Sequence, residues 1–226
     1  MVMIIVICIV AMKVLQMNIK VVQKNTYISI RVVCTVLFAL SILRYVTLLL
    51  FTRASSMEIL IKVQPFYFIT SMSIPIAILL LLWYITPLYR TKIDPIGIIL
   101  LCIPWVIFYI LLFILKPYEI IKSQKVGYTL KLIYSWDYYL AALQGISIFI
   151  FILAALYGFI LYKHQQTRSQ YMILIMCLLL FLADGMIYFG LSAPMIPVFT
   201  LTEVLGFLGI YYGFSKPPID ARGIQR

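Results

Sequence analysis

Three ionisable side chains lie inside long apolar stretches of the sequence. They are Arg44 in ALSILRYVTLLLF, Asp184 in CLLLFLADGMIYFGL and Glu203 in FTLTEVLGFLGIYYGF. A charged group at the centre of a membrane costs roughly 2.5–3.5 kcal/mol on insertion scales, so such residues normally face protein or a water-filled cavity. One cation facing two acids lowers the cost of all three. A cluster of this kind can fix helix packing, bind a ligand or signal, or carry protons or ions.

The positions of these residues along the helices that must carry them indicate similar depths. Arg44 lies about 12 residues from the cytoplasmic start of its helix, or roughly 18 Å at 1.5 Å per residue. Asp184 lies about 13 residues along an equally oriented helix, or roughly 20 Å. Glu203 enters from the other side and lies roughly 22 Å from the cytoplasmic face of a ~30 Å core. The sequence therefore predicts an Arg44–Asp184–Glu203 cluster in the outer half of a helix bundle.

Residues near this predicted cluster support a site at the outer mouth of the bundle. Tyr188 lies one turn after Asp184, where it can donate a hydrogen bond to the carboxylate. Trp136 is expected near the mouth. Small residues let membrane helices approach closely, and Glu203 shares a helix face with several of them: Gly206, Gly209 and Gly213. We expect this face to pack on a neighbouring helix.

The composition of the chain is that of an integral membrane protein. Of its 226 residues, 65% are hydrophobic and only 11% are charged, whereas soluble domains are about 45–50% apolar and roughly 25% charged. The apolar runs are long and continuous, which favours helices over barrel strands. The sequence predicts an all-α polytopic membrane helix bundle, with one transmembrane domain over 1–214 and a short cytoplasmic tail at 215–226. Seven spans are expected, with six as an alternative: 1–17, 32–52, 66–88, 95–115, 137–162, 171–191 and 198–214.

Two features interrupt this regular pattern. Pro75 and Pro104 lie inside the third and fourth spans, where each removes a backbone hydrogen bond and is expected to kink its helix. The longest connection, 116–136, mixes lysine with isoleucine, leucine and tyrosine. It is expected to lie outside, either as an interfacial loop with snorkelling lysines or as a cap that contacts a ligand at the bundle mouth.

The basic residues set the predicted orientation. The net charge is +11, but the lysines and arginines fall mostly between apolar runs, where they contact anionic lipid headgroups rather than nucleic acid. One set of alternate connections holds ten of them: Lys20, Lys24, Arg31, Arg90, Lys92, Lys163, Arg168, Lys216, Arg222 and Arg226. The other set holds six: Arg53, Lys62, Lys116, Lys122, Lys125 and Lys131. This bias favours an outside N-terminus and a cytoplasmic C-terminus in the cell membrane. The richness in Ile, Lys and Tyr suggests an AT-rich bacterial genome.

Sequence motifs for catalysis, metal binding or cofactor binding are missing. His164 is the single histidine, and there is no glycine-rich phosphate loop and no G-x-S-x-G elbow. The cysteines lie singly within apolar runs, which predicts neither a disulfide framework nor a metal site: Cys8, Cys34, Cys102 and Cys177. We therefore expect a protein that is not an enzyme and that holds no metal or cofactor.

Several features of residues 27–214 together resemble a known family. A Tyr- and Trp-rich start of the fifth span is followed by a short basic loop ending in RSQY, a sixth helix leading to YFGL, a turn with proline and a glycine-bearing last helix. This layout resembles the seven-helix N-terminal sensor region of bacterial membrane histidine kinases. The resemblance implies an outside N-terminus and transmission of a signal to a cytoplasmic catalytic domain. Because no phosphoacceptor-histidine helix or ATP-binding domain follows the last span, kinase activity is expected to belong to a partner, unless the sequence is part of a longer chain.

Two functions follow from these observations as expectations. The first is a stand-alone seven-helix membrane sensor or accessory subunit. It would bind a small or lipidic ligand, or a partner membrane protein such as a kinase or transporter component, and would signal through that partner. The alternative is a small permease or the membrane subunit of a transporter, with the intramembrane charges lining the path. A purely structural role of these charges is the third possibility.

Overall fold

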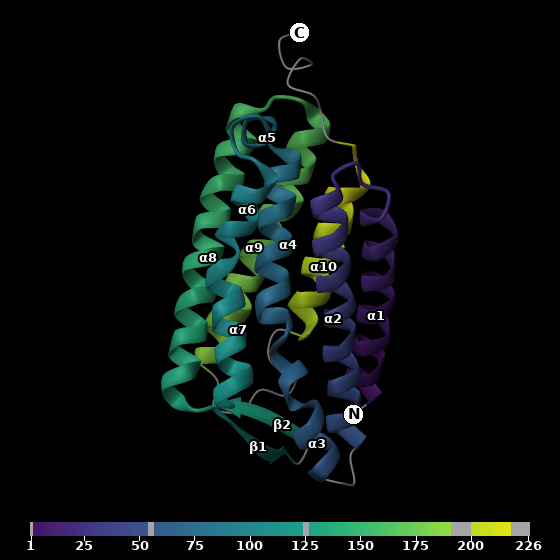
Figure 1. Ribbon diagram of the computed structural model, residues 1–226, viewed down its shortest axis with the longest axis vertical. Helices are drawn as coiled ribbons and strands as arrows, with labels where there is room; N and C mark the ends of the chain where they lie inside the picture. The colour runs from purple at the N-terminus through teal and green to yellow at the C-terminus, as the bar shows by residue number, and fades with distance from the viewer. Residues whose placement is uncertain (1, 54–56, 124–126, 191–199, 218–226) are drawn as a thin grey trace.

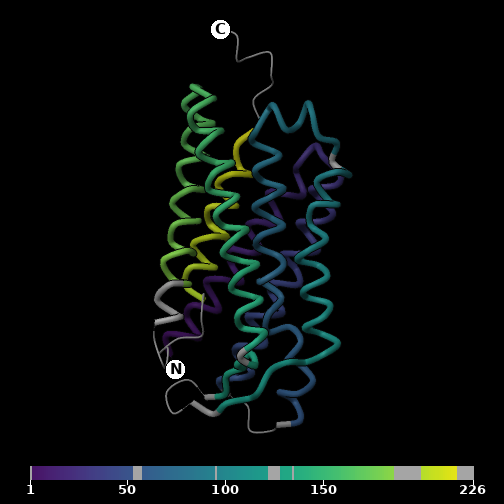
Figure 2. The backbone as a smooth tube through the Cα atoms, turned by 90° about the vertical axis from the view of Figure 1, so that its left-hand side faces the viewer, coloured from purple at the N-terminus to yellow at the C-terminus, as the bar shows by residue number. Residues whose placement is uncertain are grey.

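The structure is a bundle of helices that run along one long axis, with a small β-hairpin across one end (Figures 1 and 2). This computed structural model describes residues 2–53, 57–123, 127–190 and 200–217. Its elements are α1 (Val2–Val22), α2 (Ile28–Arg53), α3 (Met57–Val63), η1 (Gln64–Phe68), α4 (Thr70–Ile85), α5 (Pro87–Lys92), α6 (Pro95–Leu101), α7 (Ile103–Leu115), β1 (Tyr118–Ser123), β2 (Gly127–Leu132), α8 (Tyr134–Leu161), α9 (Gln165–Gly190) and α10 (Thr200–Ser215).

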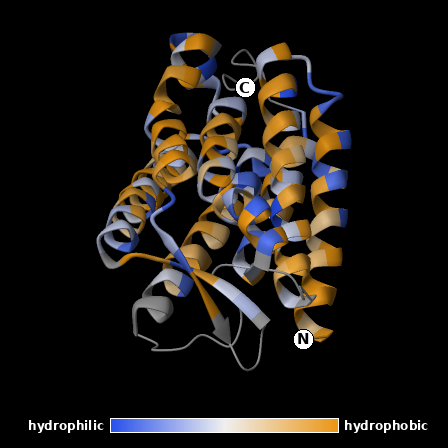
Figure 3. Ribbon diagram, turned by 60° about the horizontal axis from the view of Figure 1, so that its bottom comes forward, coloured by the Kyte–Doolittle hydropathy of each residue, from blue (hydrophilic) through white to orange (hydrophobic). Residues whose placement is uncertain are grey.

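Five helical segments of the described chain are long and apolar enough to cross a membrane. They are Val2–Val22, Ile28–Thr52, Glu58–Ile85, Ser135–Leu161 and Gln165–Gly185. The predicted multi-pass helical membrane protein is thereby confirmed, and hydrophobic residues cover most of the helices (Figure 3). The finer prediction of seven spans is not shown. The predicted fourth span divides into α6 and α7, of which α7 has 13 residues, and α10 has 16 residues.

The two prolines predicted to kink helices behave differently. The helix breaks at Cys102, two residues before Pro104, because Pro104 has no N–H for the carbonyl four residues earlier and its ring crowds that carbonyl. Pro75 instead lies inside α4, which continues from Thr70 to Ile85. The third predicted span begins earlier than expected, at Met57, and is interrupted by the 3-10 turn η1.

The long connection after α7 contains the hairpin of β1 and β2. The strands are antiparallel, with Tyr118 opposite Leu132 and Ile120 opposite Leu130. Because side chains alternate between the two faces of a strand, Leu130 and Leu132 are buried against the bundle while Lys131 is exposed. This connection was predicted to be either an interfacial loop or a cap, and its described residues form a hairpin across one end of the helices (Figure 3).

The glycine face of α10 packs against two neighbouring helices. A Cβ atom added at Gly206 would lie 2.5 Å from Phe181 Cε2 on α9, and one added at Gly209 would lie 2.6 Å from Cys177 Sγ on the same helix. Gly213 meets Leu81 on α4 in the same way. Membrane helices gain little from the hydrophobic effect between them, so this close packing is a main source of association. It holds Glu203, on the same helix, at a fixed place in the bundle.

Buried polar side chains add hydrogen bonds between the helices. Asn18 Nδ2 on α1 donates to the Phe207 carbonyl on α10 at 2.9 Å. Ser41 on α2 and Ser73 on α4 are 2.6 Å apart between their hydroxyl oxygens. Such bonds average about 0.6 kcal/mol in membrane proteins. Together with the glycine contacts, they fix α1, α2, α4 and α10 around the site described next.

Candidate functional site: a pocket beside a buried ion pair

Arg44 of α2 and Glu203 of α10 form a buried ion pair. Arg44 Nε donates to Glu203 Oε2 at 3.0 Å, and Arg44 Nη2 lies 3.0 Å from Glu203 Oε1. Their side chains are only 5% and 6% exposed. In this bidentate geometry the planar guanidinium contacts both carboxylate oxygens. The structure thus brings together two of the three residues of the predicted cluster.

Further groups complete the coordination of this pair. Tyr45 Oη donates to Glu203 Oε2 at 3.0 Å, and Thr70 Oγ1 donates to Glu203 Oε1 at 2.7 Å. Arg44 Nη1 donates to the Tyr67 carbonyl, and the guanidinium lies 5.5 Å from the centre of the Tyr67 ring. Tyr67 belongs to η1, where the change from 3-10 to α-helix interrupts the regular backbone pattern. The pair therefore links α2, α10 and the η1–α4 junction.

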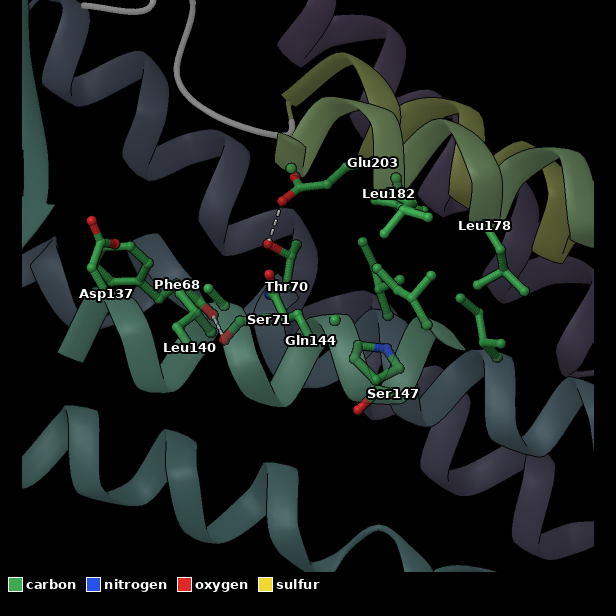
Figure 4. A pocket seen from close by; sticks show the side chains of 18 of the residues that line it. Phe68, Thr70, Ser71, Asp137, Leu140, Gln144, Ser147, Leu178, Leu182 and Glu203 are labelled. Atoms are coloured by element: carbon green, nitrogen blue, oxygen red, sulfur yellow. Dashed lines mark hydrogen bonds between the residues drawn. The ribbon is translucent and has the colours of Figure 1, made fainter. Parts of the chain in front are cut away.

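A pocket of about 230 Å³ lies beside the ion pair, between α4, α8 and α9. Arg44, Thr70 and Glu203 form part of its wall, and Leu130 and Leu132 of β2 close one end. Most of the remaining lining is aliphatic or aromatic. Figure 4 shows the α8 side of the pocket, where Asp137, Leu140, Gln144 and Ser147 follow one another along the helix. Their spacing of three and four residues places them on one helix face.

The polar side chains of the pocket fall into two groups. Ser147 donates to the Leu143 carbonyl and accepts a hydrogen bond from Trp105 Nε1 at 3.2 Å, and Ser71 donates to the Phe68 carbonyl at 2.6 Å. Gln144 and Asp137 are half-buried and have no hydrogen bond or ion pair within the described residues. The first group is satisfied by the protein, whereas the second is available to a bound molecule.

Asp184 is placed differently from the prediction. The hydrogen bond that the structure gives to its carboxylate comes from Thr202 Oγ1 to Oδ2, at 2.6 Å. Thr202 and Glu203 are successive residues of α10, so their side chains point about 100° apart around the helix. Thr202 consequently bonds to α9, while Glu203 bonds to α2 and α4. Asp184 is half-buried and does not line the pocket.

Of the two aromatic residues predicted near the mouth, Trp136 is described and does not line the pocket. Tyr188 belongs to the last turn of α9, and its side chain lies outside the described part of the structure. The Trp136 ring packs near Phe108 of α7 and Tyr139, with ring centroids 6.0 and 6.2 Å away. The next residue in the chain, Asp137, lines the pocket.

The sequence prediction missed Tyr45, Thr70 and Asp137. Tyr45 and Thr70 carry hydroxyl groups within apolar runs, and nothing in the sequence alone pairs them with Glu203. Asp137 had a usable signal, because it lies in register with Gln144 and Ser147 on one face of the fifth span. Within the described ranges, no three His, Cys, Asp or Glu residues are grouped so as to hold a metal ion.

Comparison with other proteins finds no protein-family model that matches the sequence, and no matching curated protein. The resemblance to histidine-kinase sensor regions therefore stays a prediction.

Proposed function

We propose that this protein is a membrane sensor or accessory subunit that binds a small or lipidic ligand in the pocket between α4, α8 and α9. The ligand changes the position of α10, and a partner membrane protein responds to that change. The N-terminus and hairpin lie outside and the C-terminus is cytoplasmic, with α6–α7 as a broken span and α10 as a short one. In this orientation the protein works as the sensor region of a histidine kinase would, with the catalytic domain on the partner.

One observation carries this proposal: the ion pair that holds α10 is also part of the pocket wall. Arg44, Thr70 and Glu203 all line the pocket, and their bonds connect α2, α4 and α10. A ligand shifts a conformational equilibrium only through contacts that differ between the two states. A molecule in this pocket touches the residues that determine where α10 sits, so it has the means to bias such an equilibrium.

A permease is the second candidate function, and the interrupted helices favour it. The η1 turn and the break at Cys102 both divide apolar helical segments. Many secondary transporters use broken helices near the membrane midplane to bind substrate and ions. In this function the pocket would be a transport site, and α10 would move during each transport cycle.

Native mass spectrometry of the protein released gently from its own membrane tests the proposal. We expect a stoichiometric second protein and a bound small molecule. The molecule should be lost in Gly145→Phe and retained in Gly145→Ala, because a Cβ at Gly145 meets nothing within 4 Å and a larger side chain would extend into the pocket. A chain without a partner, combined with solute uptake by proteoliposomes that Gly145→Phe blocks, would replace the sensor by the permease.

A further inference from the structure

We infer that the ligand of this pocket is a cationic amphiphile, an apolar chain carrying an ammonium group that binds the Asp137 carboxylate. This inference rests on the proposed function, since it assumes that the pocket is a ligand site. It adds the chemical class of the ligand and the residue that selects it.

Asp137 has the features of an anionic group left open for a ligand. Its half-buried side chain lies in the first turn of α8 and lines the pocket. Figure 4 places it at one end of the row of lining residues on this helix. In the described chain it has no hydrogen bond and no ion pair. Lys131 of β2 is near enough to act on the Asp137 charge electrostatically, but its side chain is exposed and does not line the pocket. A partly desolvated carboxylate is stabilised by a bound cation.

The other charges of the pocket are already used by the fold. Glu203 accepts hydrogen bonds from Arg44, Tyr45 and Thr70, and Arg44 binds both Glu203 and the Tyr67 carbonyl. An anionic head group would have to displace Glu203 from Arg44 or lie against Asp137, and both are unfavourable. The electrostatics of the wall therefore select against carboxylate and phosphate ligands and in favour of an ammonium group.

The shape of the pocket supplies a site for the apolar part of the molecule. From Asp137 to Ser147 the lined face of α8 extends for about 15 Å along the helix axis. Beyond the acid, the wall is formed largely by aliphatic and aromatic residues such as Leu140, Ile148, Phe151 and Leu178. Gln144 lies between them with a free amide. An ammonium group at Asp137 thus leaves its chain directed inward, towards the ion pair.

The binding of two amphiphilic probes to the full chain in phosphatidylglycerol nanodiscs tests the inference. The probes are dodecylamine, which is cationic, and dodecanol, which has the same chain and no charge. The variants are Asp137→Asn, the pocket-filling Gly145→Phe, and Glu119→Gln as the control. Glu119 is exposed on β1, opposite Lys131 and at the same end of the bundle. Glu119→Gln therefore removes one negative charge at this end without changing a residue that lines the pocket.

We expect Asp137→Asn to weaken dodecylamine binding by about 10- to 100-fold, which corresponds to loss of one charge-assisted hydrogen bond. Dodecanol binding should not change, Glu119→Gln should bind both probes like wild type, and Gly145→Phe should bind neither. If Gly145→Phe abolishes binding but Asp137→Asn binds dodecylamine normally, the inference fails and the pocket of the proposed function stands. If Gly145→Phe binds both probes like wild type, both fail.

A second measurement covers the case in which Asp137→Asn does not fold. Wild type must then prefer dodecylamine to dodecanol by at least about tenfold over the background of Gly145→Phe, and equal affinities would overturn the inference. Adding phosphatidylethanolamine to the nanodiscs identifies the source of the ammonium group. Competition by this lipid assigns the site to an amine headgroup of the membrane, and lack of competition assigns it to a free amphiphilic amine.

Discussion

Two carboxylates lie in the wall of the same pocket, and their surroundings are opposite. Glu203 is almost fully buried and accepts hydrogen bonds from Arg44, Tyr45 and Thr70. Asp137 is half-buried and has no such partner within the part of the chain described. The Glu203 carboxylate is bonded within the fold, whereas the Asp137 carboxylate is available to a bound molecule. The hydrogen-bond donors around an acid therefore indicate its role in a membrane protein better than its depth in the membrane does.

The largest expected effect on stability comes from removing Arg44, the cation that pairs with Glu203. Arg44→Met leaves Glu203 buried without its counter-ion, and breaking a buried pair in this way costs about 3–5 kcal/mol of unfolding free energy. Thermal unfolding in detergent micelles measures the loss. The double variant Arg44→Met, Glu203→Leu should be more stable than Arg44→Met alone, because no unpaired charge remains. A double variant less stable than the single one would show that the pair acts in another way.

Removing a single donor to Glu203 should have the next largest effect. Thr70→Val keeps the shape of the side chain but deletes the 2.7 Å bond to the carboxylate. Hydrogen bonds to charged groups contribute about 1.5–3 kcal/mol. The neighbouring variant Ser71→Ala loses only a bond to the Phe68 carbonyl and should cost less in the same unfolding experiment. Equal losses of unfolding free energy in the two variants would show that the bond to Glu203 contributes no more than an ordinary side-chain bond to the backbone.

Two glycines of α8 test the same contrast between a packed and an open environment. A Cβ at Gly158 would overlap the Tyr171 ring, which is fully buried and bonded to Thr86 at 2.7 Å. Gly158→Ala should therefore cost about 1–3 kcal/mol of unfolding free energy, as overpacking does. Gly145→Ala faces open space and should be neutral or slightly stabilising. Chemical denaturation of the two variants side by side measures the difference.

The smallest expected effect is that of Asp137→Asn on stability. This carboxylate has no hydrogen bond or ion pair to lose within the described residues, and only its favourable position in the first turn of α8 is lost. The unfolding free energy of the variant should therefore fall by no more than about 0.3–1 kcal/mol. The variant thus separates stability from ligand binding. A loss comparable to that of Thr70→Val would mean that Asp137 belongs to the structural group with Glu203.

Depth along a helix was predictable from the sequence, but direction around the helix was not. Counting residues from the membrane faces placed Arg44 and Glu203 at one level, and they do meet. The same count placed Asp184 with them, yet its bond goes to Thr202. A rotation of about 100° between successive residues is enough to change the neighbouring helix. Hydropathy reports the axial position alone, and the glycine contacts that set the rotation depend on helices distant in sequence.

The β1–β2 hairpin and the pocket position of Asp137 were not predicted from the sequence, for related reasons. Leu130, Lys131 and Leu132 alternate as a strand does, but six residues in each strand are a weak signal between long apolar helices. Asp137 lies where an acid in the first turn of a helix is favourable by itself. Only the fold shows that this first turn opens into a pocket.

The ion pair also has a consequence for how the protein is made. Arg44 and Glu203 are 159 residues apart in the chain, and synthesis proceeds at about 5–20 residues per second. A chain inserted as it is synthesised holds Arg44 in the membrane for roughly 8 to 30 s before Glu203 has been added. During that interval the early helices carry an unneutralised cation. An incomplete chain that lacks α10 thus keeps a charge in the membrane that the finished protein does not display, and membrane proteases have a physical basis for telling the two apart.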